Sequence, residues 1–163
     1  MIPYEKISLI SEKKHNKVWL ANTNEPDNII VVKEISHANT DILNSISSID
    51  NAHIPHILCW ETKNELTTVV EEYVSGLPLN TYILKNKLTE QEIIKLFLQI
   101  CEGIKVLHNQ SPSIIHRDLK PSNILVSSDG IVKIIDFDAA RKYNETADTD
   151  TCHLGTAAFA SPE

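Results

Sequence analysis

The chain has 163 residues, of which 42% are apolar, and its formal net charge at pH 7 is -7. This size can bury one sizeable core or two small lobes, but it excludes two large independent domains. The acidic excess argues against nucleic acid and anionic membranes as partners, because both attract clustered Lys and Arg.

The first residues carry no sign of export. The start, "MIPYEKISLISEKKHNK", lacks the apolar centre of a signal peptide, and no apolar run is long enough to cross a membrane. The 3 cysteines are widely spaced and include no CxxC pair, which excludes a disulfide framework and a zinc site as interpretations. We therefore expect a cytoplasmic protein with reduced thiols.

The first third of the sequence predicts strands. Three β-rich runs, "KVWLAN", "NIIVVKEI" and "LTTVVEEYV", are separated by turn-like segments. Between the second and third runs, "NTDILNSISSID" places Ile42, Leu43, Ile46 and Ile49 at helical spacing behind an Asn or Thr cap. This spacing predicts one short helix within a β-rich region.

The middle of the sequence predicts a long helix over residues 90–107. Thr89 and Glu92 have the spacing of a capping box, and a broad apolar face follows. Cys101 lies on this face, so we expect it in the core. Three short strands, "SII", "NILVS" and "VKIID", come next, and residues 139–163 read as loop.

Three motifs follow one another in the second half: "HRDLKPSN" at 116–123, "IIDFD" at 134–138 and "GTAAFASPE" at 155–163. In this order they resemble the catalytic loop, the metal loop and the end of the activation segment of a protein kinase. The stretch from "IIDFD" onward is similar to small eukaryotic-like serine/threonine kinases of Gram-positive bacteria. The resemblance ends at the Pro-Glu pair, where this family continues through further helices, so we expect a truncated chain.

The resemblance implies an α+β, protein-kinase-like fold. Residues 1–73 would form the small β-rich N-lobe with one short helix. Residues 74–163 would form part of a mainly helical C-lobe, with the hinge, the long helix, the catalytic loop and the activation segment.

The resemblance also implies roles for the polar residues of the second half. Asp118 would orient the attacking hydroxyl and accept its proton, and Lys120 would stabilise the transferring phosphoryl group. Asn123 and Asp136 would hold Mg²⁺ through hard oxygen ligands. Lys120 and Thr156 together resemble serine/threonine kinases more than tyrosine kinases.

The ATP-binding residues of the first half are assigned in the same way. Lys33 would contact the α- and β-phosphates of ATP, and the backbone around Glu72 to Val74 would bind the adenine. Two carboxylates remain open as the partner of Lys33: Asp41, on the short helix, and Glu71, which stands where the family has an apolar residue.

The sequence departs from the family at two places where the family has glycine. Ser11, Lys13 and Asn16 stand where the phosphate-covering loop has glycines, and their side chains hinder a close approach of the backbone to phosphate. Asp138 replaces the glycine of Asp-Phe-Gly, which narrows the φ range of that loop.

Two functions are consistent with these residues. The first is an ATP- and Mg²⁺-dependent protein kinase that phosphorylates Ser or Thr of a protein substrate. The alternative is a non-catalytic, kinase-like module that binds nucleotide or acts as a scaffold. Either form would need the further helices of the family, or a partner chain, to cover the apolar face of the helix at 90–107.

Overall fold

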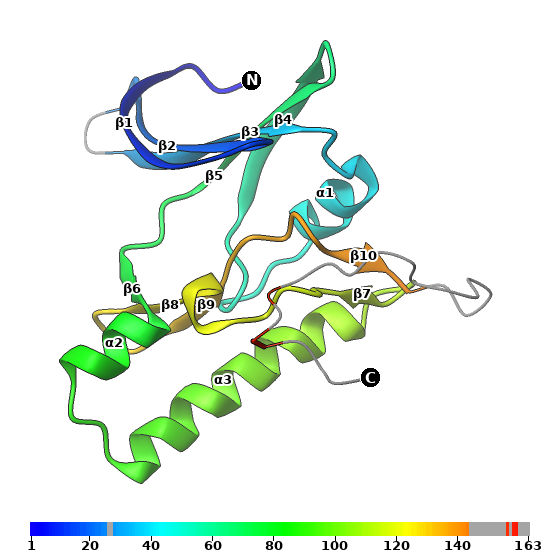
Figure 1. Ribbon diagram of the computed structural model, residues 1–163. Helices are drawn as coiled ribbons and strands as arrows, with labels where there is room; N and C mark the ends of the chain where they lie inside the picture. The colour runs from blue at the N-terminus through cyan, green and yellow to red at the C-terminus, as the bar shows by residue number, and fades with distance from the viewer. Residues whose placement is uncertain (26–27, 144–155, 157, 160–163) are drawn as a thin grey trace. The chain divides into compact units, whose positions relative to one another are not determined.

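The computed structural model describes residues 1–25, 28–143, 156, 158 and 159 (Figure 1). Their contacts divide the chain into two compact units. The first unit contains Met1–Asp50 and Pro55–Tyr73, and the second contains Asn51–Ile54 and Val74–Glu163. Each unit is described by itself below.

The first unit is built on an antiparallel sheet with the strand order β1-β2-β3-β5-β4 (Figure 1). The strands are β1 Tyr4–Lys13, β2 Asn16–Thr23, β3 Ile29–Ser36, β4 Ile57–Lys63 and β5 Leu66–Glu72. Three of them contain the β-rich runs that the sequence predicts. β1 and β4 were not predicted.

Both faces of the central strands are buried. Ile30 and Val32 of β3 pack with Val70 of β5 on one face. On the other face, Ile35 and Val69 pack with Leu43 of the helix α1 (Thr40–Ser47). β-branched side chains on both faces explain why β3 and β5 read as continuous apolar runs.

The helix α1 covers Thr40–Ser47 and confirms the predicted short helix. It begins at Asn39, whose side-chain oxygen accepts a hydrogen bond from the backbone N–H of Ile42 at 3.3 Å. The residues that α1 buries are Ile42, Leu43 and Ile46. Asp41 lies in its first turn and is exposed.

The described residues of the second unit form two helices, one 3₁₀ turn and short strands. The helices are α2 Leu79–Lys85 and α3 Glu90–His108, and the 3₁₀ turn η1 covers Pro121–Asn123. The strands are β6 Gly76–Pro78, β7 Ile114–Ile115, β8 Ile124–Ser127, β9 Val132–Ile134 and β10 Arg141–Lys142. They form a sheet of order β6-β8-β9 and a separate pair, β10-β7.

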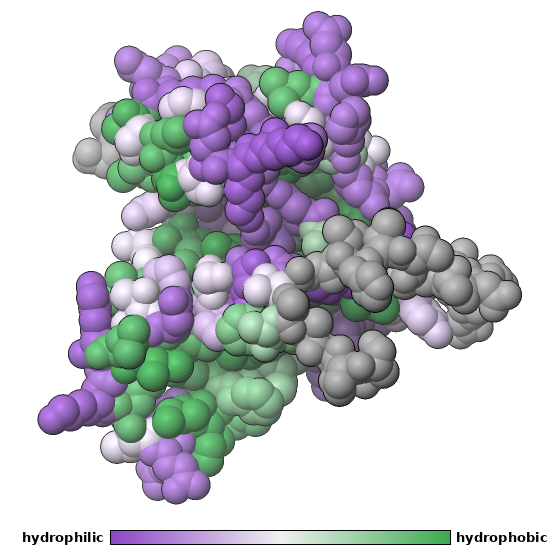
Figure 2. All heavy atoms as spheres, in the orientation of Figure 1, coloured by the Kyte–Doolittle hydropathy of each residue, from purple (hydrophilic) through white to green (hydrophobic). Residues whose placement is uncertain are grey.

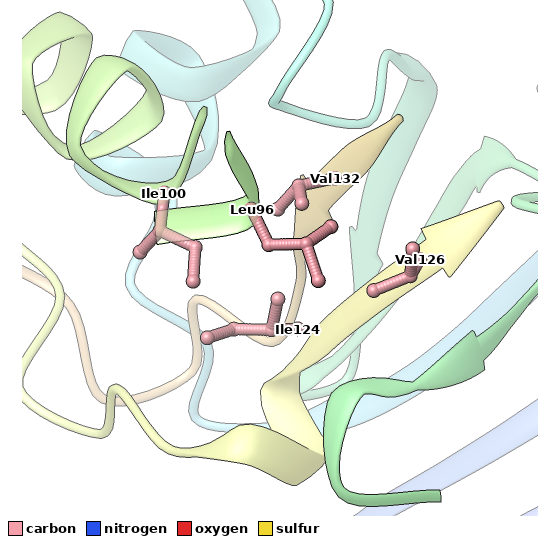
Figure 3. Close-up of a cluster of buried hydrophobic side chains, with 5 residues drawn as sticks. All are labelled: Leu96, Ile100, Ile124, Val126 and Val132. Atoms are coloured by element: carbon pink, nitrogen blue, oxygen red, sulfur yellow. The ribbon is translucent and has the colours of Figure 1, made fainter. Parts of the chain in front are cut away.

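The helix α3 confirms the predicted long helix and its capping box between Thr89 and Glu92. Its buried side packs on the β8–β9 hairpin through the cluster Leu96, Ile100, Ile124, Val126 and Val132 (Figure 3). This cluster is an apolar core of the second unit, and it fixes the hairpin that separates the two polar motifs.

The opposite side of α3 is apolar but exposed. Phe97 is 63% exposed and Leu98 is 55% exposed. In Figure 2 apolar residues gather on the surface over α2 and α3. Cys101 lies on this side and is exposed, so the prediction that it is in the core is wrong. Its helical spacing among apolar residues was a poor guide, because only a narrow stripe of the wide apolar face meets the β8–β9 hairpin.

No helix in the described part of the chain is long and apolar enough to cross a membrane.

Candidate functional site

His116 anchors the start of the "HRDLKPSN" loop, directly after β7. It is 3% exposed, and its Nδ1 accepts a hydrogen bond from the backbone N–H of Asp118 at 3.4 Å. Its Nε2 is then the donor to the carbonyl of Ile135, 3.2 Å away. Burial lowers the pKa of His116, against the opposing effects of the Ile135 carbonyl and of the charges of Asp136 and Asp118. A neutral imidazole therefore connects this loop to the residues after β9.

The Asp118 carboxylate lies at the centre of a hydrogen-bonded cluster, which we call the Asp118 cluster (Asp118, Lys120, Asn123 and Thr156). Lys120 Nζ donates to Asp118 Oδ2 at 2.7 Å, and the Thr156 hydroxyl donates to Oδ1 at 2.9 Å. Asn123 Nδ2 donates to Oδ2 at 3.0 Å and to the Asp118 carbonyl at 2.9 Å. Lys120 Nζ also donates to Thr156 Oγ1 at 2.8 Å. Three side chains, two from the 116–123 loop and one from Thr156, thus fix the Asp118 carboxylate.

These contacts keep Asp118 ionised. Partial burial acts to raise the pKa of Asp118, but the hydrogen bonds from Lys120, Thr156 and Asn123 and the charge of Lys120 outweigh it. The resulting pKa lies below the ordinary value of 3.8. At neutral pH the group is a carboxylate that can accept hydrogen bonds and orient a hydroxyl.

The predicted metal ligands lie on two neighbouring segments of the second unit. Asn123 is the last residue of η1, and Asp136 comes two residues after the end of β9. The backbone N–H of Ile135, the residue before Asp136, donates to the Asn123 carbonyl at 2.9 Å. Asn123 is buried, with its amide nitrogen turned to Asp118, so its amide oxygen is the atom of that side chain suited to a cation.

The donor types therefore fit Mg²⁺, which prefers oxygen ligands and usually takes only one or two carboxylates from a protein. In the described residues no group of three or more His, Cys, Asp or Glu is arranged to hold a metal ion. An ion here would therefore take part of its coordination from water or phosphate.

The backbone of the "DFD" segment is constrained at its first aspartate. Asp136 has φ 68, in the left-handed region, which Asp tolerates better than most residues. Asp138 has no positive φ and its side chain is exposed. The replacement of glycine at 138 therefore causes no backbone strain in this conformation.

Lys33 forms an ion pair with Glu71 within the first unit. Lys33 Nζ lies 2.9 Å from Glu71 Oε2, and the two side chains are 10% and 11% exposed. Asp41, the other carboxylate that the sequence left open, is exposed in the first turn of α1.

Glu72 and Val74, the predicted hinge residues, are both half-buried. The Glu72 carboxylate accepts a hydrogen bond from the backbone N–H of His56 at 3.0 Å, and its own N–H donates to the His56 carbonyl at 2.9 Å. Glu72 thus holds the backbone of His56, the residue before β4, and no sequence motif indicated this role. Val74 is the first residue of the second unit after Tyr73.

The segment that aligns with the phosphate-covering loop is a tight hairpin. Lys13 at the end of β1 pairs with Asn16 at the start of β2, so that Lys14 and His15 form the turn. Ser11 lies in β1 opposite Val18. From Ser11 to the turn the two strands pair in register, after a register shift between Leu9 and Ser11, and side chains stand in place of the glycines of the family.

Comparison with known proteins places these features in a family. Residues 4–163 match the family described as the protein kinase domain. The chain belongs to the protein kinase family. Its α+β structure, with a five-stranded antiparallel sheet in the first unit and α3 in the second, is that of a kinase fold.

Three curated relatives of this kinase domain are named probable serine/threonine-protein kinases. The chain is 42% identical to one from Lactococcus lactis over 97 residues, which cover 58% of this chain and 15% of the relative. It is 37% identical to one from Clostridium acetobutylicum over 117 residues, which cover 71% and 18%. It is 27% identical to one from Clostridium perfringens over 172 residues, which cover 98% and 25%. The chain therefore spans a quarter or less of the length of these relatives.

Proposed function

We propose that this chain is a serine/threonine protein kinase that transfers the γ-phosphoryl group of ATP to a Ser or Thr hydroxyl. The observation that carries the proposal is the Asp118 cluster, in which an ionised carboxylate is held by Lys120, Thr156 and Asn123. The names of the relatives support the choice of acceptor.

In this proposal Asp118 acts on the attacking hydroxyl. The bond from the hydroxyl oxygen to the γ-phosphorus forms, the bond from that phosphorus to the ADP oxygen breaks, and the hydroxyl proton passes to Asp118. Lys120 is a cation close enough to Asp118 to stabilise the phosphoryl group during transfer. Asn123 and Asp136 would supply oxygen ligands for Mg²⁺, which would neutralise phosphate charge when bound. Lys33 is assigned to the α- and β-phosphates, and the backbone of Glu72 to Val74 to the adenine.

One feature favours a second candidate, a kinase-like module that binds nucleotide without transfer. The β1–β2 hairpin has side chains at Ser11, Lys13 and Asn16, which hinder the backbone contacts that glycines allow. Weak or unproductive nucleotide binding would follow.

Phosphotransfer from γ-labelled ATP with Mg²⁺ to a mixture of Ser, Thr and Tyr peptides separates the two candidates. We expect label on Ser or Thr, and a loss of at least about a hundredfold in kcat for Asp118→Asn with nucleotide binding retained. The control Asp129→Asn removes a carboxylate from the β8–β9 turn of the same unit and should keep wild-type activity. Nucleotide binding without transfer in the wild type would instead support the second candidate, and label only on Tyr would contradict the proposed acceptor.

A further inference from the structure

Lys33 and Glu71 belong to neighbouring strands of one sheet. In the register of β3 and β5, Lys33 lies opposite Val69 and Glu71 lies opposite Val31. The two residues are therefore diagonal neighbours on the same face, a spacing that long side chains can bridge. The distance of 2.9 Å between Nζ and Oε2 shows that they do so.

Burial makes each charge depend on the other. Both residues are 8% exposed, and Val69, beside them on the same face, is 0% exposed. A charge shielded from water in this way is strongly disfavoured unless an opposite charge or hydrogen-bonding group compensates it. Glu71 supplies such a charge to Lys33 at contact distance.

The short helix does not supply this carboxylate. α1 turns Ile42, Leu43 and Ile46 inward, while Asp41 is exposed in its first turn. Of the two carboxylates that the sequence left open, the one on the sheet is in contact with the lysine.

We propose that Glu71 of β5 is the counter-ion that positions Lys33, and that the pairing is therefore independent of the position of α1. The proposal rests on the role assigned to Lys33 at the phosphates of ATP. In the kinase family the equivalent lysine pairs with a glutamate of a helix, and movement of that helix controls the pair. Here both partners are held by the β3–β5 ladder, so a displacement of α1 leaves the lysine in place.

The pairing is compatible with nucleotide binding. An ammonium group carries three N–H donors, and a single carboxylate oxygen accepts one of them at this distance. The contact with Glu71 does not by itself prevent phosphate oxygens from approaching the same Nζ.

The pH dependence of lysine acylation tests the assignment without any need for activity. The full chain and the variants Glu71→Gln and Asp41→Asn are pulsed with acetic anhydride from pH 7 to 11, and acetylation of Lys33 is measured by mass spectrometry. Loss of the Glu71 charge favours the neutral amine, so the Lys33 profile should move to lower pH and its rate at pH 8 should rise by at least about tenfold. Lys63, which is 75% exposed, serves as an internal reference and should not change.

Asp41→Asn is the matched control, because it removes one exposed carboxylate from the same unit. We expect its Lys33 profile to coincide with that of the wild type. A shift for Asp41→Asn with none for Glu71→Gln would overturn the proposal. A rise in rate that is equal at all pH values would also overturn it, because it would report better access of the reagent and no change in protonation.

A stability cycle covers the case in which Glu71→Gln fails to fold. Lys33→Met, Glu71→Leu and the double variant are compared by chemical denaturation. The double variant should unfold at a higher denaturant concentration than the two single losses predict, because no charge remains unpaired. Additive losses would contradict a direct pair.

Measuring the affinity for Mg·ATP shows whether the counter-ion assignment or the proposed function fails. Glu71→Gln should weaken ATP binding several-fold and Asp41→Asn should not. If the wild type binds no ATP while the Glu71→Gln acylation profile still shifts, the proposed function fails and the counter-ion assignment stands. If the wild type binds and transfers phosphate while Glu71→Gln matches it in profile and affinity, only the counter-ion assignment fails.

Discussion

The Asp118 cluster in the second unit and the Lys33–Glu71 pair in the first are both held by short contacts, but for different physical reasons. In the Asp118 cluster each carboxylate oxygen has at least one donor, at 2.7 to 3.0 Å. The Lys33–Glu71 pair joins two strands of one sheet, and its strength comes from burial. The first group is specified by hydrogen-bond geometry and the second by the absence of water around it.

Thr156 is the residue of the Asp118 cluster that is most distant in sequence, and its hydroxyl tests the cluster directly. Thr156→Val keeps the size of the side chain but removes the hydrogen bonds to Asp118 Oδ1 and Lys120 Nζ. A hydrogen bond to a charged group contributes about 1.5 to 3 kcal/mol, so kcat should fall by about ten- to a hundredfold. Steady-state kinetics of phosphotransfer measure this.

Thr156→Ser is the control for that variant, because it keeps the hydroxyl and loses only a methyl group. It should retain most of the wild-type rate. Equal rates for the Ser and Val variants would mean that the hydroxyl does not contribute to the orientation of Asp118.

At the scale of single elements, the first three strands are tied together by one charged group. Glu34 of β3 accepts hydrogen bonds from Lys6 Nζ of β1 at 2.7 Å and from Trp19 Nε1 of β2 at 2.9 Å. Burial acts to raise the pKa of Glu34, but these two bonds and the charges of Lys6 and Lys17 hold it below its ordinary value of 4.5. The charged form of Glu34 thus stabilises the edge of the sheet.

Glu34→Gln should therefore lower stability in a pH-dependent way. The pKa of Glu34 is lower in the folded state, so its contribution is fully present above about pH 4.5 and is lost as pH falls through the folded value. We expect the variant to lose about 1 kcal/mol at pH 7 and to approach the wild type as pH falls through the lowered pKa of Glu34. Urea denaturation at several pH values measures the difference. A loss that stays constant from pH 7 down to the acid limit of folding would show that the charge is not involved.

The cap of α1 provides a test of the independence of Lys33 from that helix. Asn39→Ala removes the side-chain acceptor for the N–H of Ile42 and should cost about 1 kcal/mol. Because the partner of Lys33 lies on β5, the pH profile of its acylation should be the same as in the wild type. The control Asn44→Ala replaces an exposed residue within the same helix. A shifted profile in Asn39→Ala alone would show that α1 helps to hold the lysine.

The elements that the sequence predicted correctly have a strong local signal. The α3 helix has a capping box and a long apolar periodicity, and α1 has an Asn cap. β1 was missed because eight of its ten residues are exposed, so its sequence shows no alternation. The helix α2 buries none of its residues and begins at Pro78 without a side-chain cap, so it has neither of the usual helix signals.

At the candidate site, too, the sequence predicted residues but not the contacts between them. The motifs predicted Asp118 and Lys120 as catalytic residues and used Thr156 only as a mark of serine/threonine kinases. The hydrogen bond from Thr156 to Asp118 joins residues 38 positions apart, and no motif indicated it. The choice between Asp41 and Glu71 as the partner of Lys33 depended on strand register, which a single sequence does not specify. Spacing along the chain favoured neither of them.

At the scale of the whole molecule, each unit has apolar clusters of its own. The first unit has one cluster on each face of its sheet, around Val70 and around Val69. The second unit has the cluster between α3 and the β8–β9 hairpin (Figure 3). Each unit thus has the means to unfold as a cooperative body of its own.

Two spectroscopic signals report on the units separately. The 2 tryptophans, Trp19 and Trp60, both lie in the first unit. The 19 residues of α3, in the second unit, dominate the helical circular dichroism of the described chain. Leu96→Ala, which opens the α3 cluster, should cost about 2 to 5 kcal/mol and lower the denaturation midpoint of the circular dichroism signal. The tryptophan fluorescence midpoint should stay near the wild-type value.

Val70→Ala should give the reverse result, because Val70 packs in the cluster that includes Trp19. Phe97→Ala is the control for Leu96→Ala: the two residues are adjacent on α3, but Phe97 is 63% exposed and its loss should change stability by no more than about 0.5 kcal/mol. If Leu96→Ala moves both midpoints together, the two units do not unfold independently.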